Sequence, residues 1–192
     1  MFNHHKKTAL YLAQGTYGKA VASTLADDID TIIDIEETIY AASLPYADFL
    51  IPITTGSSRQ IRECIDFVAF VRNIPHVGLE LSHKQIICGP LVIPGATACY
   101  QCYLSRIEQH GGHLPEDRLP EGFAPYHVSI GAGFLRMAFK EAECISNNIG
   151  GTVRKFNLIT GHVQQNNTVA VNRCKRCSKR FRDQLLPTLS SL

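Results

Sequence analysis

The sequence is poor in several features that mark broad classes of protein. The chain of 192 residues has no tryptophan and only two methionines, and 19% of its residues are charged, against about a quarter in an average domain. Its net charge of +2 is too small for electrostatic attraction to nucleic acid or to an anionic membrane. No apolar run approaches the roughly 20 residues that span a bilayer. The polar residues 1–7 lack the apolar stretch of a signal peptide. We therefore expect a cytoplasmic protein that binds neither nucleic acid nor membrane.

Cysteine, in contrast, is abundant, and four of the seven cysteines form two Cys-x-x-Cys pairs. The pairs are Cys99-Tyr-Gln-Cys102 and Cys174-Lys-Arg-Cys177. A structural zinc ion needs four ligands at the corners of a tetrahedron, and two such pairs supply four thiolates. Because 71 residues separate Cys102 from Cys174, the metal would hold the end of the chain against its middle. The pattern predicts a closed zinc clasp that stabilises the fold and performs no reaction.

Roles other than zinc binding stay open for the cysteine pairs. They could be redox dithiols, although we expect neither pair at the helix N-terminus of a thioredoxin-like βαβ unit. They could be disulfides, which a cytoplasmic protein disfavours, or ligands of an iron–sulfur cluster. His110 or His113 could replace one cysteine, but two complete pairs make this unnecessary. The other three cysteines lie among apolar residues, where we expect buried side chains: Cys64, Cys88 and Cys144.

Hydrophobic patterning predicts alternating strands and helices in the first half of the chain. We expect strands over residues 8–13, 31–35, 49–53 and 76–81. Helices are predicted over residues 19–25 and 59–72, with a short helical turn over 36–42. The inner face of the second helix would carry Ile61, Cys64, Ile65, Val68 and Val71.

The second half departs from this alternation. Short β segments are expected over residues 85–88 and 91–93, and helices over 103–109 and 128–145, with a loop over 110–126 between them. A hairpin of strands 152–159 and 162–171 then leads to the second cysteine pair. We expect an α/β fold with a Rossmann-like half over residues 1–88, a zinc-clasped half over 89–182 and a tail over 183–192.

Two glycines after the first strand, Gly15 and Gly18, invite comparison with a nucleotide-binding turn. Such a turn has three glycines, which let the backbone approach the phosphates at a helix N-terminus. Here the first position is Ala13, so the match is incomplete. The acidic ribose ligand expected about twenty positions further on could be Asp34, Glu36 or Glu37. The simpler interpretation, a tight turn between strand and helix, is favoured.

The segment from Gly89 to Cys102, Gly-Pro-Leu-Val-Ile-Pro-Gly-Ala-Thr-Ala-Cys-Tyr-Gln-Cys, resembles a known family. Similar segments mark the E1-like (ThiF-like) partner proteins of azoline-forming cyclodehydratases. These act in the biosynthesis of thiazole/oxazole-modified microcins, which are ribosomally made, post-translationally modified peptides (RiPPs). The family order of segment, loop, long helix, hairpin and terminal Cys-x-x-Cys matches residues 89–177. The resemblance implies a truncated Rossmann-like, E1/ThiF-like fold with zinc bound by four cysteines.

The sequence also departs from E1-like enzymes, which adenylate a carboxylate with MgATP. Only the 28 residues 19–46 separate Gly18 from the strand at Ala47-Asp48, which leaves no room for the usual ribose and phosphate ligands. Residues 54–58, Thr-Thr-Gly-Ser-Ser, stand where the family has a magnesium-binding aspartate. We therefore expect that adenylation is lost. Many members also begin with a winged-helix-like leader-binding domain. This chain starts directly at the βαβ unit, which argues against direct leader binding.

The resemblance implies a non-catalytic subunit of a peptide-modifying complex. Its partners would be a YcaO-type cyclodehydratase, a flavin-dependent azoline dehydrogenase and the precursor peptide, in a homodimer or hetero-oligomer. The loop over residues 110–126 is a candidate contact. The alternative is an active adenylyltransferase that uses Gly15 and Gly18, with Cys144 as acceptor thiol. Nucleic-acid binding by the basic residues 175–182 is disfavoured, because Phe181 is their only aromatic neighbour.

Overall fold

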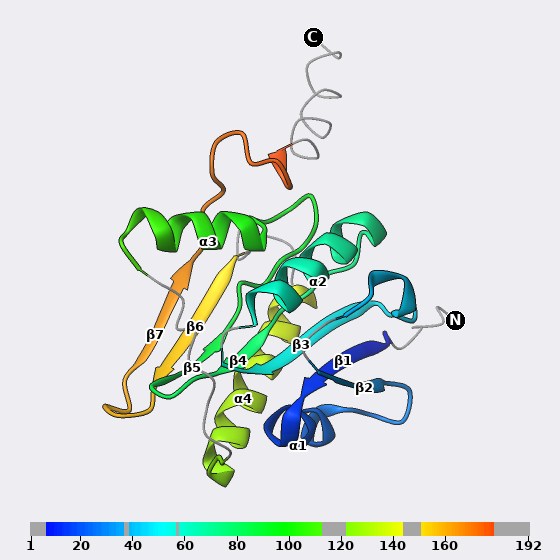
Figure 1. Cartoon of the computed structure of the whole chain (residues 1–192), viewed down its shortest axis with the longest axis vertical. Helices are drawn as coiled ribbons and strands as arrows, with labels where there is room; N and C mark the ends of the chain where they lie inside the picture. Colours follow the sequence, from blue (N-terminus) through cyan, green and yellow to red (C-terminus); the bar gives the residue numbers. More distant parts are fainter. Residues whose placement is uncertain (1–6, 37–38, 57, 113–121, 144–150, 179–192) are drawn as a thin grey trace.

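The computed structural model describes residues 7–36, 39–56, 58–112, 122–143 and 151–178 as one sheet with helices on both faces (Figure 1). The strands are β1 Ala9–Gln14, β2 Thr31–Ile35, β3 Phe49–Thr55, β4 Leu79–Leu81, β5 Gln85–Cys88, β6 Thr152–Asn157 and β7 Val163–Asn167. The helices are α1 Gly15–Leu25, α2 Arg59–Arg72, α3 Tyr100–Gln109 and α4 Pro125–Glu143, with a short 3-10 helix Ala41–Ser43. None of the described helices combines the length and hydropathy that crossing a membrane requires.

The strand order is β2-β1-β3-β4-β5-β6-β7. Strands β1 to β4 are parallel, and the β4–β5, β5–β6 and β6–β7 pairs are antiparallel. This confirms the expected α/β, Rossmann-like fold with a C-terminal hairpin. The chain leaves β1 toward β2 on one side and later places β3 on the other. The carboxyl ends of β1 and β3 therefore form the topological switch point, where open α/β sheets bind ligands.

Each face of the sheet buries its own set of apolar side chains. Helices α1 and α4 cover one face, and α2 and α3 cover the other (Figure 1). Under α1 and α4, Tyr17 and Leu135 pack against strand residues such as Ile51 and Leu79. Under α2, Ile61 and Ile65 pack against the opposite sides of β1 and β3. The strands that bear the switch point are thus buried on both faces, as parallel strands usually are.

The junction between β1 and α1 accounts for the two glycines of the turn. Helix α1 begins at Gly15, four positions before the expected start, because Gly15 adopts a left-handed φ of 63° and turns the chain directly from strand to helix. Gly18 lies against β3: a Cβ at this position would be 3.0 Å from the carbonyl oxygen of Ile53. Gly15 therefore serves the turn, and Gly18 serves close helix–strand packing.

Gly18→Ala tests this close packing. The added methyl group meets backbone atoms that cannot easily move, so we expect a loss of about 1–3 kcal/mol in the free energy of unfolding. The matched control is Gly133→Ala in α4, where no atom lies within 4 Å of the new Cβ. That change should be neutral or stabilise by up to about 1 kcal/mol, because alanine favours helix over glycine. Urea unfolding measures both, and equal midpoints for the two variants would contradict the assigned role of Gly18.

Several expected boundaries and faces are wrong in detail. Val71 does not lie on the inner face of α2: its side chain is 66% exposed and continues an exposed stripe from Phe67, one turn earlier. The expected strand over 76–81 is reduced to Leu79–Leu81, while His76 forms only isolated bridges with Leu50 and Val92.

The remaining differences concern the ends of elements. Helix α3 begins at Tyr100 rather than at residue 103, and α4 begins at Pro125, which takes residues 125 and 126 out of the expected loop. The second hairpin strand ends at Asn167 rather than at 171. The helical turn expected over 36–42 appears as Ala41–Ser43, with residues 37 and 38 outside the described part of the chain.

Candidate metal centre

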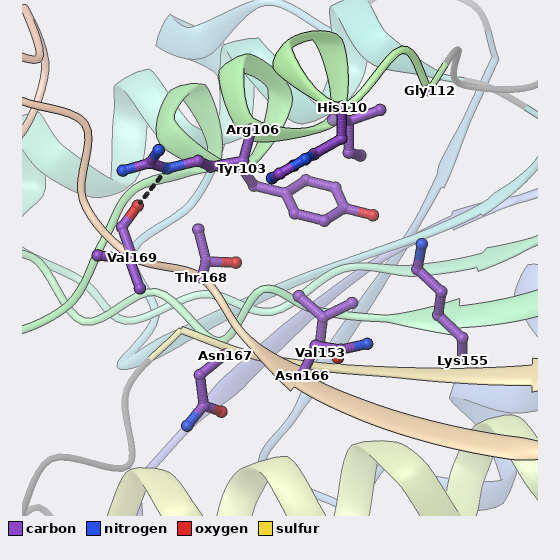
Figure 2. Close-up of a pocket in the computed structure, with 11 residues that line it drawn as sticks. Tyr103, Arg106, His110, Gly112, Val153, Lys155, Asn166, Asn167, Thr168 and Val169 are labelled. Atoms are coloured by element: carbon purple, nitrogen blue, oxygen red, sulfur yellow. Dashed lines mark hydrogen bonds between the residues drawn. The ribbon is translucent and has the colours of Figure 1, made fainter.

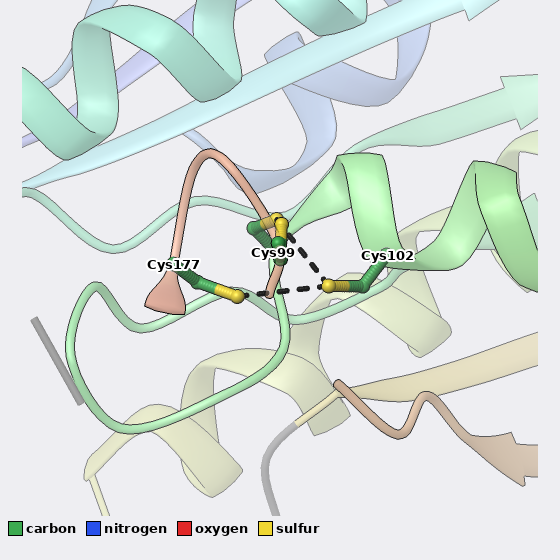
Figure 3. A group of neighbouring side chains, drawn as sticks. Cys99, Cys102 and Cys177 are labelled. Carbon is green, nitrogen blue, oxygen red and sulfur yellow. Dashed lines mark hydrogen bonds between the residues drawn. The ribbon is translucent and has the colours of Figure 1, made fainter. Parts of the chain in front are cut away.

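The four cysteines of the two pairs lie together, as expected, and Figure 3 shows three of them, Cys99, Cys102 and Cys177. The Sγ–Sγ distances are 3.7 Å for Cys99–Cys102, 3.5 Å for Cys99–Cys174 and 3.6 Å for Cys102–Cys177. All four sulfur atoms lie within 4.8 Å of one another. A tetrahedral ion with metal–sulfur bonds of about 2.3 Å needs sulfur–sulfur edges of about 3.8 Å. The donor set therefore fits a closed tetrahedral metal site.

The same distances exclude disulfides within this structure. A disulfide bond is about 2.05 Å long, and all four cysteines are free thiols. The first pair does lie at a helix N-terminus: Cys99 is the N-cap of α3 and Cys102 lies in its first turn. However, α3 lies between the antiparallel strands β5 and β6 rather than in a βαβ unit.

Neighbouring thiols lower the pKa of Cys102. Hydrogen bonds from the thiols of Cys177 and Cys99 to its sulfur lower the pKa of Cys102, with a further contribution from the Val171 N–H group at 3.3 Å. The hydrogen bond to Cys102 correspondingly raises the pKa of Cys99. A metal ion would replace the remaining thiol protons, because only thiolates act as ligands.

A carboxylate on α2 connects the two cysteine pairs. Asp66 Oδ1 accepts a hydrogen bond from the Tyr100 N–H group at 3.1 Å and lies 3.2 Å from His76 Nε2. Its other oxygen, Oδ2, lies 3.2 Å from Arg176 Nε. Tyr100 directly follows Cys99, and Arg176 directly precedes Cys177. Asp66 therefore contacts both pairs without being a ligand, and sequence reasoning missed it.

Burial around Asp66 determines which of its neighbours carries a charge. The side chains of Asp66 and His76 are fully buried, and burial lowers the pKa of His76, so its ring is neutral near pH 7. Arg176 is then the cation that faces Asp66, and its guanidinium also lies 5.0 Å from the ring centre of Phe67. Arg176 is consequently not part of a free basic surface, which weakens the nucleic-acid hypothesis. Residues 179–182 lie outside the described chain.

The other expected cysteines and histidines stand apart from the metal centre. Cys88 is buried as expected, and burial raises its pKa to about 12. Cys64 is only half-buried, with its Sγ 3.6 Å from the carbonyl oxygen of Ile39. His110 caps the end of α3, and no metal-ligand group in the described residues includes it. Cys144 and His113 lie outside the described residues.

The second candidate site, at the switch point, is crossed by a side chain. The Gln14 carboxamide donates from Nε2 to the carbonyl oxygen of Glu36 at 3.0 Å. Its Oε1 accepts hydrogen bonds from the Thr55 N–H group at 3.2 Å and from Ser58 Oγ at 3.0 Å. The three contacts join the carboxyl end of β1 to the segments that follow β2 and end β3. Gln14 therefore occupies hydrogen-bonding groups of the switch point that a ligand would need.

The acidic residues expected as ribose ligands also contact other groups of the chain. Asp34 forms a salt bridge with Lys19 at 2.6 Å, and Glu36 contributes its backbone to Gln14. Glu37 lies outside the described residues. Gly15 and Gly18 thus form a close turn between strand and helix, as the simpler interpretation expects, and neighbouring polar groups contact one another within the chain.

Comparison with known proteins gives a result at the level of fold. No family model and no curated protein matches the sequence. Among solved structures, a heterocyclase in complex with substrate and cofactor is similar, with a TM-score of 0.65 and 15% identity. The match covers 90% of this chain and 25% of the heterocyclase chain. The heterocyclase TruD has a TM-score of 0.59 and 17% identity, covering 95% and 29%.

A third similar structure, MccB of E. coli with MccA, has a TM-score of 0.63 and 14% identity, covering 90% of this chain and 67% of its own. The chain thus spans about a quarter of the length of the two heterocyclase chains and two thirds of MccB. At these identities the likeness concerns the fold, and the chain has the α/β fold shared by MccB and part of the heterocyclases.

Proposed function

We propose that this protein is a non-catalytic, E1-like scaffold or activating subunit of a complex that modifies ribosomally made peptides. In this proposal a YcaO-type partner uses ATP to form azolines, and a flavin-dependent dehydrogenase oxidises them. Zinc is the metal of the clasp and has a structural role. The chain acts as a homodimer or hetero-oligomer in the cytoplasm and presents the precursor peptide to the partner.

Two lines of support lead to this proposal. The fold is shared with heterocyclases and with MccB, which the solved structures describe as a microcin C7 biosynthetic enzyme. The segment from Gly89 to Cys102 resembles the corresponding segment of E1-like cyclodehydratase partners. Four thiolates in a closed tetrahedron leave no open ligand position, which suits a structural zinc ion rather than a catalytic one.

The observation that favours a non-catalytic role is the Gln14 bridge across the switch point. Catalysis of phosphoryl or adenylyl transfer depends on groups that position the phosphates and the metal ion. Here Gln14, at the end of β1, binds groups that follow β2 and end β3, and Asp34 binds Lys19. Residues 54–58 contribute no carboxylate to hold magnesium.

A pyrophosphate-exchange assay on the purified chain separates this proposal from the alternative. We expect no ATP–pyrophosphate exchange above background, with or without candidate peptides. Exchange at ordinary enzymatic rates without a partner would instead support an active adenylyltransferase, which the close turn at Gly15 and Gly18 would serve. Gln14→Ala in the same assay tests whether the bridge alone blocks the nucleotide.

Reconstitution tests the positive half of the proposal. The chain, the YcaO-type partner and the precursor peptide are mixed, and loss of water on cyclisation is followed by mass spectrometry. We expect cyclisation to be strongly reduced when the chain is omitted. Equal rates with and without it would contradict the proposed role.

A further inference from the structure

The last strand of the sheet, β7, has an edge that lacks the usual protection against pairing. It ends the strand order, and all five of its residues, Val163–Asn167, are exposed. Their sequence Val-Gln-Gln-Asn-Asn contains no charge and no proline, the residues with which natural proteins commonly block an edge strand. An edge of this kind can accept an extended peptide as an additional strand.

A groove of about 670 Å³ adjoins this edge. We call it the α3 groove, since α3 forms one wall and the β6–β7 hairpin forms the floor (Figure 2). Tyr103 and His110 project from α3 toward the floor, and Lys155 rises from β6 opposite Tyr103. At one end, Arg106 Nε donates to the carbonyl oxygen of Val169 at 3.5 Å and ties the chain after β7 to α3.

The charged side chains that line the α3 groove are all basic or histidine. Its lining includes Arg106, His110 and Lys155 but no aspartate or glutamate. Tyr103 is 7% exposed, and its hydroxyl group is buried with no hydrogen-bond partner among the described residues. A buried, unpartnered hydroxyl costs free energy, which an accepting ligand atom recovers. Within the described residues Lys155 forms no salt bridge, so its ammonium group is also available.

The register of the sheet places the charge relative to the edge. Glu80, Ile87, Lys155 and Gln164 are successive cross-strand partners on β4 to β7 and therefore point to the same face. Strands lie about 4.8 Å apart, so a peptide residue beside Gln164 would lie roughly 10 Å from the backbone of Lys155. A glutamate and a lysine side chain that reach toward each other span this distance. Burial raises the pKa of Glu80 to about 7, while the charges of Arg62 and Lys155 act in the opposite direction.

We propose that the edge of β7 and the α3 groove together bind an extended peptide segment that carries an acidic side chain. The peptide backbone pairs with β7, and the carboxylate beside Gln164 accepts from Lys155 and from the Tyr103 hydroxyl group. The site includes Tyr103, which directly follows Cys102 on α3, and none of its lining residues belongs to the switch point. This peptide-binding proposal is separate from the proposed subunit role, because peptide binding can be measured on the purified chain without partner proteins.

The test uses fluorescein-labelled peptides of about eight residues, with alternating valine and threonine and one central glutamate, and measures binding by fluorescence anisotropy. Matched peptides carry glutamine or lysine in place of the glutamate. We expect the glutamate peptide to bind at least about tenfold more tightly than either. Lys155→Glu should reverse the order of the glutamate and lysine peptides, while the exposed Lys140→Glu on α4 makes the same charge change elsewhere and should preserve the order.

Backbone methylation tests the strand pairing separately. Alternate residues of an added strand direct their N–H groups toward β7, so N-methylation of one alternate set should abolish binding and methylation of the other set should not. Equal binding of the glutamate and glutamine peptides, no difference between the Lys155 and Lys140 variants, or equal effects of the two methylation patterns would each overturn the proposal. Absence of saturable binding up to about millimolar peptide would also overturn it.

Circular dichroism confirms that each variant is folded. If Lys155→Glu is not folded, the uncharged variant Lys155→Met replaces it. With Lys155→Met, the preference for glutamate over glutamine peptide should disappear, and its persistence would overturn the proposal.

Discussion

We expect Cys174→Ser to abolish metal binding and to leave the protein insoluble or unfolded. Cys174 is one of four thiols around the site, and its Sγ lies 3.5 Å from that of Cys99. Structural zinc sites contribute an apparent binding free energy of about 10–16 kcal/mol, which matches or exceeds the roughly 5–15 kcal/mol net stability of a typical domain. Losing one ligand forfeits most of it. Metal analysis should find about one zinc ion per wild-type chain and little in the variant, with a large fall in melting temperature.

The control for this experiment is Cys64→Ser. Cys64 is a half-buried thiol on α2 that belongs to no metal-ligand group in the described chain. This variant should keep its zinc and melt within a few degrees of the wild type. A soluble Cys174→Ser protein with unchanged melting temperature would show that the clasp does not stabilise the fold.

Asp66→Ala should have the second-largest effect, although Asp66 does not bind the metal. Its removal leaves the Tyr100 N–H group, buried His76 and Arg176 without their shared partner. Breaking a buried charge pair by deleting one partner costs about 3–5 kcal/mol. Because the lost contacts hold both cysteine pairs, we also expect zinc to transfer to a coloured chelator at least about tenfold faster, since 1.4 kcal/mol already corresponds to a factor of ten.

Two further variants divide the role of Asp66 into its parts. Asp66→Asn keeps an oxygen that can accept from the Tyr100 N–H group but removes the charge that faces Arg176. Arg176→Met removes the same charge pair from the other side and keeps apolar contact with Phe67. In a double-mutant cycle the two changes should be non-additive, since they remove one interaction. Wild-type zinc release rates in Asp66→Ala and Arg176→Met would show that Asp66 does not position the clasp.

The sequence correctly predicts that the four cysteines lie together, because ligand spacing is a local property. Each Cys-x-x-Cys pair specifies two adjacent ligands, and four sulfur atoms then need only one long-range contact. The start of α3 is harder to predict for a physical reason: its N-cap, Cys99, makes no side-chain capping bond. The Tyr100 N–H group is satisfied instead by Asp66 of α2, which is 34 positions away. No serine, threonine or aspartate of the usual kind therefore marks this helix end.

The switch point illustrates the same limit. The sequence correctly predicts a strand, a glycine turn and a helix, and it suggests that the nucleotide ligands are missing. It gives no sign that Gln14 replaces them, because the partners of its carboxamide at Glu36 and Ser58 depend on strand order. Val71 shows the converse error: helical spacing predicts this apolar residue in the core, although α2 meets the sheet through Ile61, Ile65 and Val68.

The order of β5 and β6 in the chain has a consequence for synthesis on the ribosome. Strand β5 pairs with β4 at once, but its other edge waits for β6, and Cys99 waits for Cys174, 75 positions later. At about 5–20 residues per second, translation of that interval lasts several seconds. Until β6, residues 152–157, has been made, the nascent chain exposes an unpaired edge that carries Ile86 and Ile87. A chain that terminates before β6 would carry this unpaired edge permanently, whereas a chain that terminates between β6 and Cys174 would cover the edge but lack the second cysteine pair.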